Sequence, residues 1–124
     1  MVLSPSACQR RHRRFVLPDD GSAQVRFGYP RPGGTKFSLI VRDISSGGLS
    51  FVLDREFPGL EIGVTIERAE LTIGATTVAG DLLVMRLTPD AGAGSVCGAL
   101  FFPWGDENII GLQRLVAALD ETPD

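Results

Sequence analysis

Four arginines near the N-terminus are the first residues of this sequence with the chemistry to bind a ligand. Arg10, Arg11, Arg13 and Arg14 lie close together, and residues 1–14 contain no acid. A guanidinium group is always charged, and its planar fork fits phosphate oxygens and the O6 and N7 acceptors of guanine. Arg10 and Arg14 share a face in a helical turn, whereas an extended arm presents them in succession. The arginines alone are equally typical of a solvated basic run or a weak RNA-binding tail.

A second group is the segment Asp43-x-Ser45-x-x-Gly48, which lies between two apolar runs. The Asp43 carboxylate offers two acceptors for the paired donors of a guanine Watson–Crick edge, and Ser45 adds a hydroxyl. Gly47 and Gly48 can adopt positive φ and leave room for a ligand against the backbone. A β-turn in which Asp43 and Ser45 bond neighbouring amides is the structural alternative. With the arginines, the segment predicts a pocket for a small molecule that carries phosphates and base edges.

The charge distribution argues against a polymeric ligand. The net charge is −3, and outside the first fourteen residues the chain has eight basic and fifteen acidic residues. A protein that binds nucleic acid through its general surface is expected to be basic, because backbone phosphates supply most of the affinity. The charges therefore favour a small anion held by a few arginines. No run approaches the ~18 apolar residues of a membrane span and the N-terminus lacks a signal peptide's apolar stretch, so we expect a cytoplasmic protein.

Catalytic and metal chemistry have little support in the sequence. Ser45 and Ser46 have no histidine or lysine base nearby, so nucleophilic catalysis is not expected. One histidine, His12, and two distant cysteines, Cys8 and Cys97, indicate neither a zinc site nor a disulfide. We therefore expect a binding protein without enzymatic activity, metal or cofactor.

The elements that must position these residues are short strands. A chain of 124 residues is expected to form one domain, and its apolar runs alternate with turn residues. The predicted strands are 23–28, 36–44, 49–53, 64–73, 77–87 and 95–102, with a bend or bulge at 68–70. Without crossover helices, six antiparallel strands favour a closed barrel, which removes exposed edges. Alternation in the second strand predicts that one face is shared by Phe37, Leu39, Val41 and Asp43.

The pattern changes to helical spacing after the last predicted strand. Asp106 can cap a helix that starts near Glu107, where acids are favourable. The apolar residues that recur at helical spacing are Ile109, Leu112, Val116 and Leu119. We expect this helix to lie on the barrel or to close one end, with Trp104 packed beneath it. The expected organisation is a disordered leader (1–9), a barrel domain with its helix (10–119) and a tail (120–124), with a mobile arm at 9–14.

The two motifs in this order resemble the paired signature of PilZ domains, which are bacterial receptors for cyclic di-GMP. Asp43-x-Ser45-x-x-Gly48 begins 29 residues after Arg10-x-x-x-Arg14. The segment VRDISSGGLSF (41–51) is similar to the family's strand–turn–strand, and GALFFPWGDENIIGLQRLV (98–116) to its last strand and closing helix. Many members of the family have a proline where this sequence has Ser46. The serine loosens the turn but removes no ligand contact. The resemblance covers nearly the whole chain, from residue 9 to residue 119.

The resemblance implies an all-β, PilZ-like split barrel of six antiparallel strands, with a flexible N-terminal arm and a C-terminal α-helix. It implies that Arg10 and Arg14 bind ligand phosphate and guanine edges, and that Asp43 and Ser45 bind one guanine. Further implied site residues are Gly48, which shapes the turn, and Arg11, Arg13 and Gly47, which could add contacts.

The expected function is that of a cyclic di-GMP receptor whose arginine arm closes over the ligand. Closure creates a surface for a downstream protein partner, in the regulation of motility, adhesion or exopolysaccharide. The alternative is a nucleotide-independent PilZ-like module for protein–protein interaction, in which the basic arm is only a tether. Affinity for cyclic di-GMP discriminates between the two.

Overall fold

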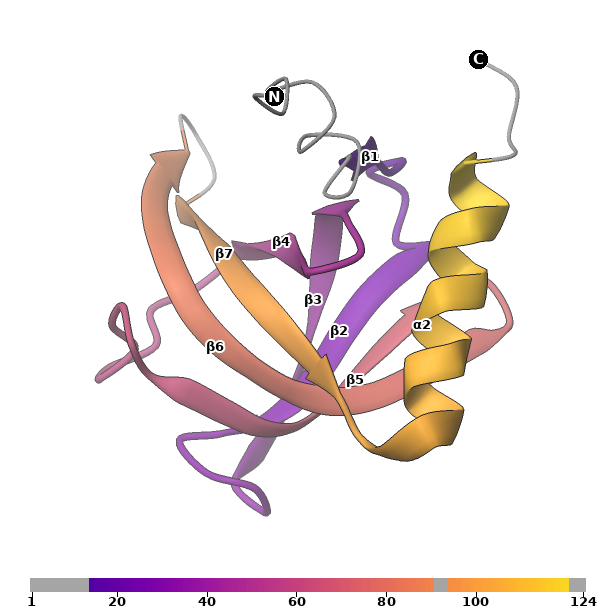
Figure 1. The fold of residues 1–124 in the computed structure, drawn as a ribbon. Coiled ribbons are helices and arrows are strands. Elements are labelled where there is room, and N and C mark those ends of the chain that lie inside the picture. The colour runs from indigo at the N-terminus through magenta and orange to yellow at the C-terminus, as the bar shows by residue number, and fades with distance from the viewer. Residues whose placement is uncertain (1–13, 91–93, 121–124) are drawn as a thin grey trace, which may run out of the picture.

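The part of the chain that the computed structural model describes, residues 14–90 and 94–120, contains seven strands and one helix (Figure 1). The strands are β1 (Phe15–Val16), β2 (Ala23–Tyr29), β3 (Thr35–Ile44), β4 (Gly48–Leu53), β5 (Thr65–Ile73), β6 (Thr76–Asp90) and β7 (Gly94–Pro103), and the helix is α2 (Gly105–Asp120). The six predicted strands are confirmed, with every boundary within three residues of its predicted position. The short strand β1 is an addition that the sequence did not predict.

The strands form one antiparallel sheet in the order β1-β3-β2-β5-β6-β7-β4. A further pairing between β4 and β3 closes six of them into a barrel, with β1 added on β3. The bend predicted at 68–70 is present: the β5–β6 register shifts between Ile66 and Ala69, and Arg68 has a φ of 60°. Closure pairs the backbone groups that open sheet edges would leave exposed. The predicted six-stranded antiparallel barrel is therefore confirmed.

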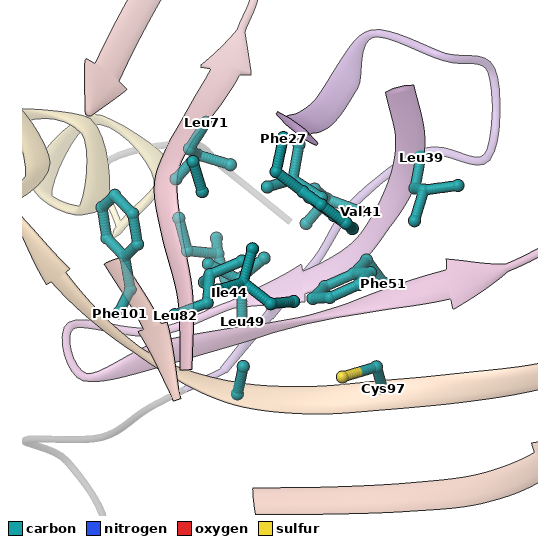
Figure 2. Close-up of a cluster of buried hydrophobic side chains, with 14 of the residues drawn as sticks. Phe27, Leu39, Val41, Ile44, Leu49, Phe51, Leu71, Leu82, Cys97 and Phe101 are labelled. Atoms are coloured by element: carbon teal, nitrogen blue, oxygen red, sulfur yellow. The ribbon is translucent and has the colours of Figure 1, made fainter. Parts of the chain in front are cut away.

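The barrel interior is filled by apolar side chains that alternate along each strand. Val25, Val41 and Phe51 are fully buried, and they come from three neighbouring strands. Figure 2 shows Phe51, Phe27 and Cys97 among the side chains that gather in this interior. Burial raises the pKa of the Cys97 thiol to about 12. Cys97 therefore stays protonated at neutral pH and serves as a small apolar core residue.

An aromatic cluster closes the end of the barrel opposite the β3–β4 turn. Phe57, from the β4–β5 connection, packs against Phe27, Tyr29 and Phe37 with ring centroids 4.9–6.1 Å apart. The Tyr29 hydroxyl donates a hydrogen bond to the carbonyl oxygen of Pro58 at 2.6 Å. These contacts attach the β4–β5 connection to β2 and β3 at this end of the barrel.

Helix α2 packs on the barrel through β6 and β7. Leu112 and Leu115 are its buried residues, whereas Ile109 is 40% exposed. The predicted apolar stripe is therefore wrong at Ile109. Leu115, which was not part of that stripe, packs on the barrel instead. A Cβ atom at Gly111 would lie 3.4 Å from the Val78 side chain, so the helix approaches β6 closely at this residue. Glycine also lowers the intrinsic stability of the helix. No helix in residues 14–90 and 94–120 is long and apolar enough to cross a membrane.

The expectation that Trp104 packs beneath this helix is wrong. The residue is 42% exposed, and its indole Nε1–H donates to Asp81 Oδ1 at 2.9 Å. Its carbonyl oxygen accepts a hydrogen bond from Asn108 Nδ2 at 2.6 Å, and Asn108 Oδ1 accepts one from the Ala79 amide at 2.8 Å. Because the indole N–H needs a polar partner, Trp104 serves as a polar link between the first turn of α2 and β6.

Candidate ligand-binding groove

A groove of about 590 Å³ crosses the outer face of the barrel where β1, β3, β4, β7 and β6 lie side by side. Among the predicted site residues, those that line it are Arg14, Asp43, Ser45, Gly47 and Gly48. Lining residues that were not predicted include Val16, Ser50, Met85, Arg86, Gly98 and Leu100. The predicted residues Arg10, Arg11 and Arg13 lie outside the described part of the chain. The groove thus brings together the described members of both sequence motifs.

Strand β1 explains how Arg14 reaches the second motif. Phe15 pairs with Ile44 and Val16 with Asp43, and the Leu17 amide donates to the Arg42 carbonyl oxygen at 2.8 Å. β1 therefore lies on the edge of β3 beyond the part that pairs with β2. Continued by one residue, this register brings Arg14 to the level of Ser45, at the start of the turn.

The floor of the groove contains one row of directly paired residues that crosses five strands. The row runs through Val16, Asp43, Ser50, Gly98 and Arg86. All five line the groove. The row joins a carboxylate, a hydroxyl and a guanidinium on one face of the sheet, although they come from β3, β4 and β6.

A β-bulge in β3 turns Asp43 out of the barrel. Val41 pairs with Phe51 and Asp43 pairs with Ser50, so Arg42 is the extra residue. Regular alternation predicted that Asp43 shares the face of Val41, and this prediction is wrong. The inserted residue reverses the alternation, because a bulge places two residues opposite one. Val41 and Ile44 are therefore both buried in the core, and Asp43 lies in the groove.

A second bulge, in β6, delivers two adjacent side chains to the same groove. Val84 pairs with Ala99 and Arg86 with Gly98, which leaves Met85 as the extra residue. Met85 and Arg86 are both exposed and both line the groove, whereas Val84 is fully buried. In a regular strand these neighbours would point to opposite faces.

Hydrogen bonds hold the acid and the turn in place. The Ser50 hydroxyl donates to Asp43 Oδ2 at 2.7 Å, and Ser50 is itself buried. In the turn, the Ser45 amide donates to the Gly48 carbonyl oxygen at 2.8 Å, and the Gly47 amide donates to Ser45 Oγ at 3.3 Å. The turn contacts that were considered as an alternative are therefore present at Ser45. They do not exclude a ligand, because the same residues line an open groove.

Gly48 shapes the turn by a different means from the positive φ that was predicted. Neither Gly47 nor Gly48 is among the glycines with positive φ, so the predicted use of that conformation is wrong. Gly48 is instead required by a close approach of β4 to β7, because a Cβ atom there would collide with the carbonyl oxygen of Ala99. The motif glycine thus keeps the turn tight against the neighbouring strand.

Sequence reasoning missed Ser50, Met85, Arg86 and Gly98. The one local signal was Ser50, a polar residue inside an otherwise apolar strand two positions after Gly48. Arg86 and Gly98 lie in predicted strands, but only the register of β6 with β7 brings them to this face.

The chemistry of the groove suits a ligand that is both anionic and aromatic. Arg14 and Arg86 provide fixed positive charge, and Asp43 provides acceptors for paired N–H donors. The exposed apolar side chains of Met85 and Leu100 can lie against the face of a flat ring. The groove therefore offers positive charge, hydrogen-bond acceptors and apolar surface to one ligand.

Comparisons with known proteins show which class of fold this chain has. No protein-family model matches the sequence, and neither does any curated protein. Among solved structures, MrkH of K. pneumonia in complex with c-di-GMP is similar over 90% of this chain and 52% of that chain, with a TM-score of 0.75 and 18% identity. The PilZ domain of YcgR from Escherichia coli with c-di-GMP is similar over 90% of this chain and 92% of that chain, with a TM-score of 0.67 and 18% identity. The Bacillus subtilis inhibitor of motility, MotI/DgrA, is similar over 92% and 53%, with a TM-score of 0.65 and 15% identity.

These structures define the class of fold: the chain has the fold of a PilZ domain. The chain spans about half the length of the MrkH and MotI/DgrA chains, and nearly all of the YcgR domain. The resemblance inferred from the two motifs is therefore confirmed at the level of the fold.

Proposed function

We propose that this protein is a cytoplasmic receptor for cyclic di-GMP. The observation that carries the proposal is the convergence of Arg14, Asp43 and Ser45 on one groove, although the two motifs are 29 residues apart in the sequence. The similarity to structures of c-di-GMP complexes supports the same ligand. In this site Asp43 and Ser45 bind one guanine, and Arg14 binds phosphate or the O6/N7 edge of a base.

The N-terminal arginines complete the site in this proposal. Arg10 binds the ligand together with Arg14, and Arg11 and Arg13 add charge beside them. Each charge-assisted hydrogen bond is worth about 1.5–3 kcal/mol. A ligand with two phosphates therefore draws the arm over the barrel face.

The closed arm forms a new surface that a downstream protein recognises. The receptor itself is not catalytic, and its output is this interaction in the control of motility, adhesion or exopolysaccharide production. Support for an output through binding comes from the exposed apolar side chains at the junction of β7 and α2. Phe102 is 50% exposed and Ile110 is 45% exposed.

Calorimetric titration of cyclic di-GMP into the purified protein tests the proposal, with GTP and cyclic GMP as comparison ligands. We expect saturable binding, and a loss of about ten- to a hundredfold in affinity for Arg14→Ala. Arg114→Ala is the matched control, because Arg114 is an exposed arginine on α2 outside the groove. Equal affinities of wild type and Arg14→Ala would contradict the site.

Absence of binding by the folded wild type would instead favour the second candidate, a nucleotide-independent interaction module with the same barrel. The exposed apolar residues near Phe102 support this candidate as well, because they can contact a partner without any nucleotide. Under it, Phe102→Ser would weaken capture of a partner, and Arg14→Ala would have no effect.

A further inference from the structure

Arg86 lies on the opposite side of the groove from the sequence motifs. Arg14 directly precedes β1, whereas Arg86 lies on β6, at the other end of the row of paired residues. Arg86 is exposed, and no ion pair joins it to another side chain in the described part of the chain. The β6 bulge is the reason that this arginine faces the groove together with its neighbour Met85.

Gly98 leaves a gap in the row between Ser50 and Arg86. It pairs with Ser50 on one side and with Arg86 on the other, and it has no side chain to occupy the outer face. A Cβ atom at this position would meet only the Cβ of Arg86, at 3.5 Å, which is ordinary contact. The backbone therefore does not require glycine here. The missing side chain leaves room for a ligand against β7, with Val96 and Leu100 on either side along the strand.

The spacing of the row sets the size of a ligand that can contact both ends. Three strand-to-strand steps separate Asp43 from Arg86, at about 4.8 Å for each step. A ligand that bonds to Asp43 and Arg86 together must therefore have polar groups at two separated positions. A cyclic dinucleotide has two bases and two phosphates, whereas a cyclic mononucleotide bound to Asp43 has one of each.

We propose that Arg86 is a second cationic contact of the groove, and that the gap at Gly98 receives the half of cyclic di-GMP distant from Asp43. This inference rests on the proposed function, and it adds a determinant that neither sequence motif contains. Arg86 bonds to the second phosphate or to the O6/N7 edge of the second guanine. Met85 and Leu100 pack against the face of that base.

Calorimetric titration of cyclic di-GMP into six proteins tests the inference: wild type, Arg86→Ala, Arg86→Lys, Gly98→Leu, Arg14→Ala and the control Arg114→Ala. We expect Arg86→Ala to bind about ten- to a hundredfold more weakly than wild type. Arg86→Lys is expected to recover part of the loss, because it restores the charge without the planar fork. Gly98→Leu is expected to weaken binding at least about tenfold by filling the gap, without loss of charge. Thermal unfolding checks that each variant is folded.

The outcomes separate this inference from the proposed function. If wild type binds and folded Arg86→Ala and Gly98→Leu bind equally well, the inference is overturned while the receptor function stands. If Arg14→Ala loses affinity and Arg86→Ala does not, the ligand occupies only the motif side of the groove, which also overturns it. If folded wild type does not bind, the proposed function fails and the inference fails with it.

Discussion

Two faces of the same barrel treat their polar residues differently. On the outer face of β2, β5, the first half of β3 and the start of β6, polar side chains pair with one another across the strands. Arg26 lies 3.7 Å from Glu70, the Thr72 and Thr77 hydroxyls are 3.0 Å apart, and the Ser38 hydroxyl donates to Gln24 Oε1. We call this face the paired wall. On the groove face, Arg14 and Arg86 make no ion pair with another side chain in the described part of the chain.

The two faces differ in how their polar residues are arranged. Cross-strand pairs between neighbouring strands are ordinary stabilising contacts of a sheet. In the groove, Gly98 separates Arg86 from Ser50, and the bulges in β3 and β6 bring Asp43 and Arg86 to the outer surface. The two arginines thus make no ion pair with the groove's carboxylate, and Asp43 is held by a neutral hydroxyl instead. The comparison predicts that substitutions in the groove change binding, and that those on the paired wall do not.

Gly48→Ala is expected to have the largest effect on stability in this comparison. The added Cβ would collide with the carbonyl oxygen of Ala99, which belongs to the backbone and cannot move aside easily. Overpacking of this kind costs about 1–3 kcal/mol. Gly98→Ala is the matched control on the same face, because its Cβ has ordinary contacts. Urea unfolding of the two variants measures the difference, and equal stabilities would contradict the role assigned to Gly48.

Ser50→Ala is expected to have an intermediate effect, on ligand binding. Ser50 donates to Asp43 Oδ2, so its loss releases the carboxylate from one orientation. We expect an affinity loss corresponding to about 1 kcal/mol, roughly fivefold. Ser38→Ala removes a comparable hydrogen bond from the paired wall and should leave affinity unchanged. Calorimetry with cyclic di-GMP measures the affinities of both variants. Similar losses of affinity in Ser50→Ala and Ser38→Ala would refute a specific role of Ser50.

Arg26→Ala is expected to have the smallest effect. The Arg26 and Glu70 side chains are 46% and 44% exposed, and a pair this accessible to solvent is worth at most about 1 kcal/mol. Ligand affinity should not change, because the pair lies outside the groove. Chemical denaturation and calorimetry on the same sample test both statements. A large loss of affinity would show that the paired wall takes part in binding.

The fold was predictable because the information for it is local. Turn residues separate every pair of strands, and the alternation of apolar residues is regular in most of them. The bulge of β5 was predicted, but those of β3 and β6 were not, and the face predicted for Asp43 is wrong as a result. Arg42 and Met85 are ordinary strand residues by sequence, and their status as bulges depends on pairing with β4 and β7.

The candidate site was predictable only where a motif marks it. Arg14, Asp43, Ser45, Gly47 and Gly48 were identified from two short segments, and the structure brings them to one groove. Arg86 could not be identified in this way, because the register that places it opposite Gly98 involves residues far apart in the sequence. β1 was missed for a similar reason: a two-residue strand has no periodicity.

The most direct test of the account is a two-dimensional ¹H–¹⁵N NMR titration of the wild-type protein with cyclic di-GMP. The amide signals report both faces in one experiment. We expect saturable shifts at Asp43, the turn 45–48, Gly98 and Arg86, with the signals of Arg26 and Thr72 on the paired wall unchanged. Shifts centred on the paired wall, or no shifts at all at saturating ligand, would contradict this expectation.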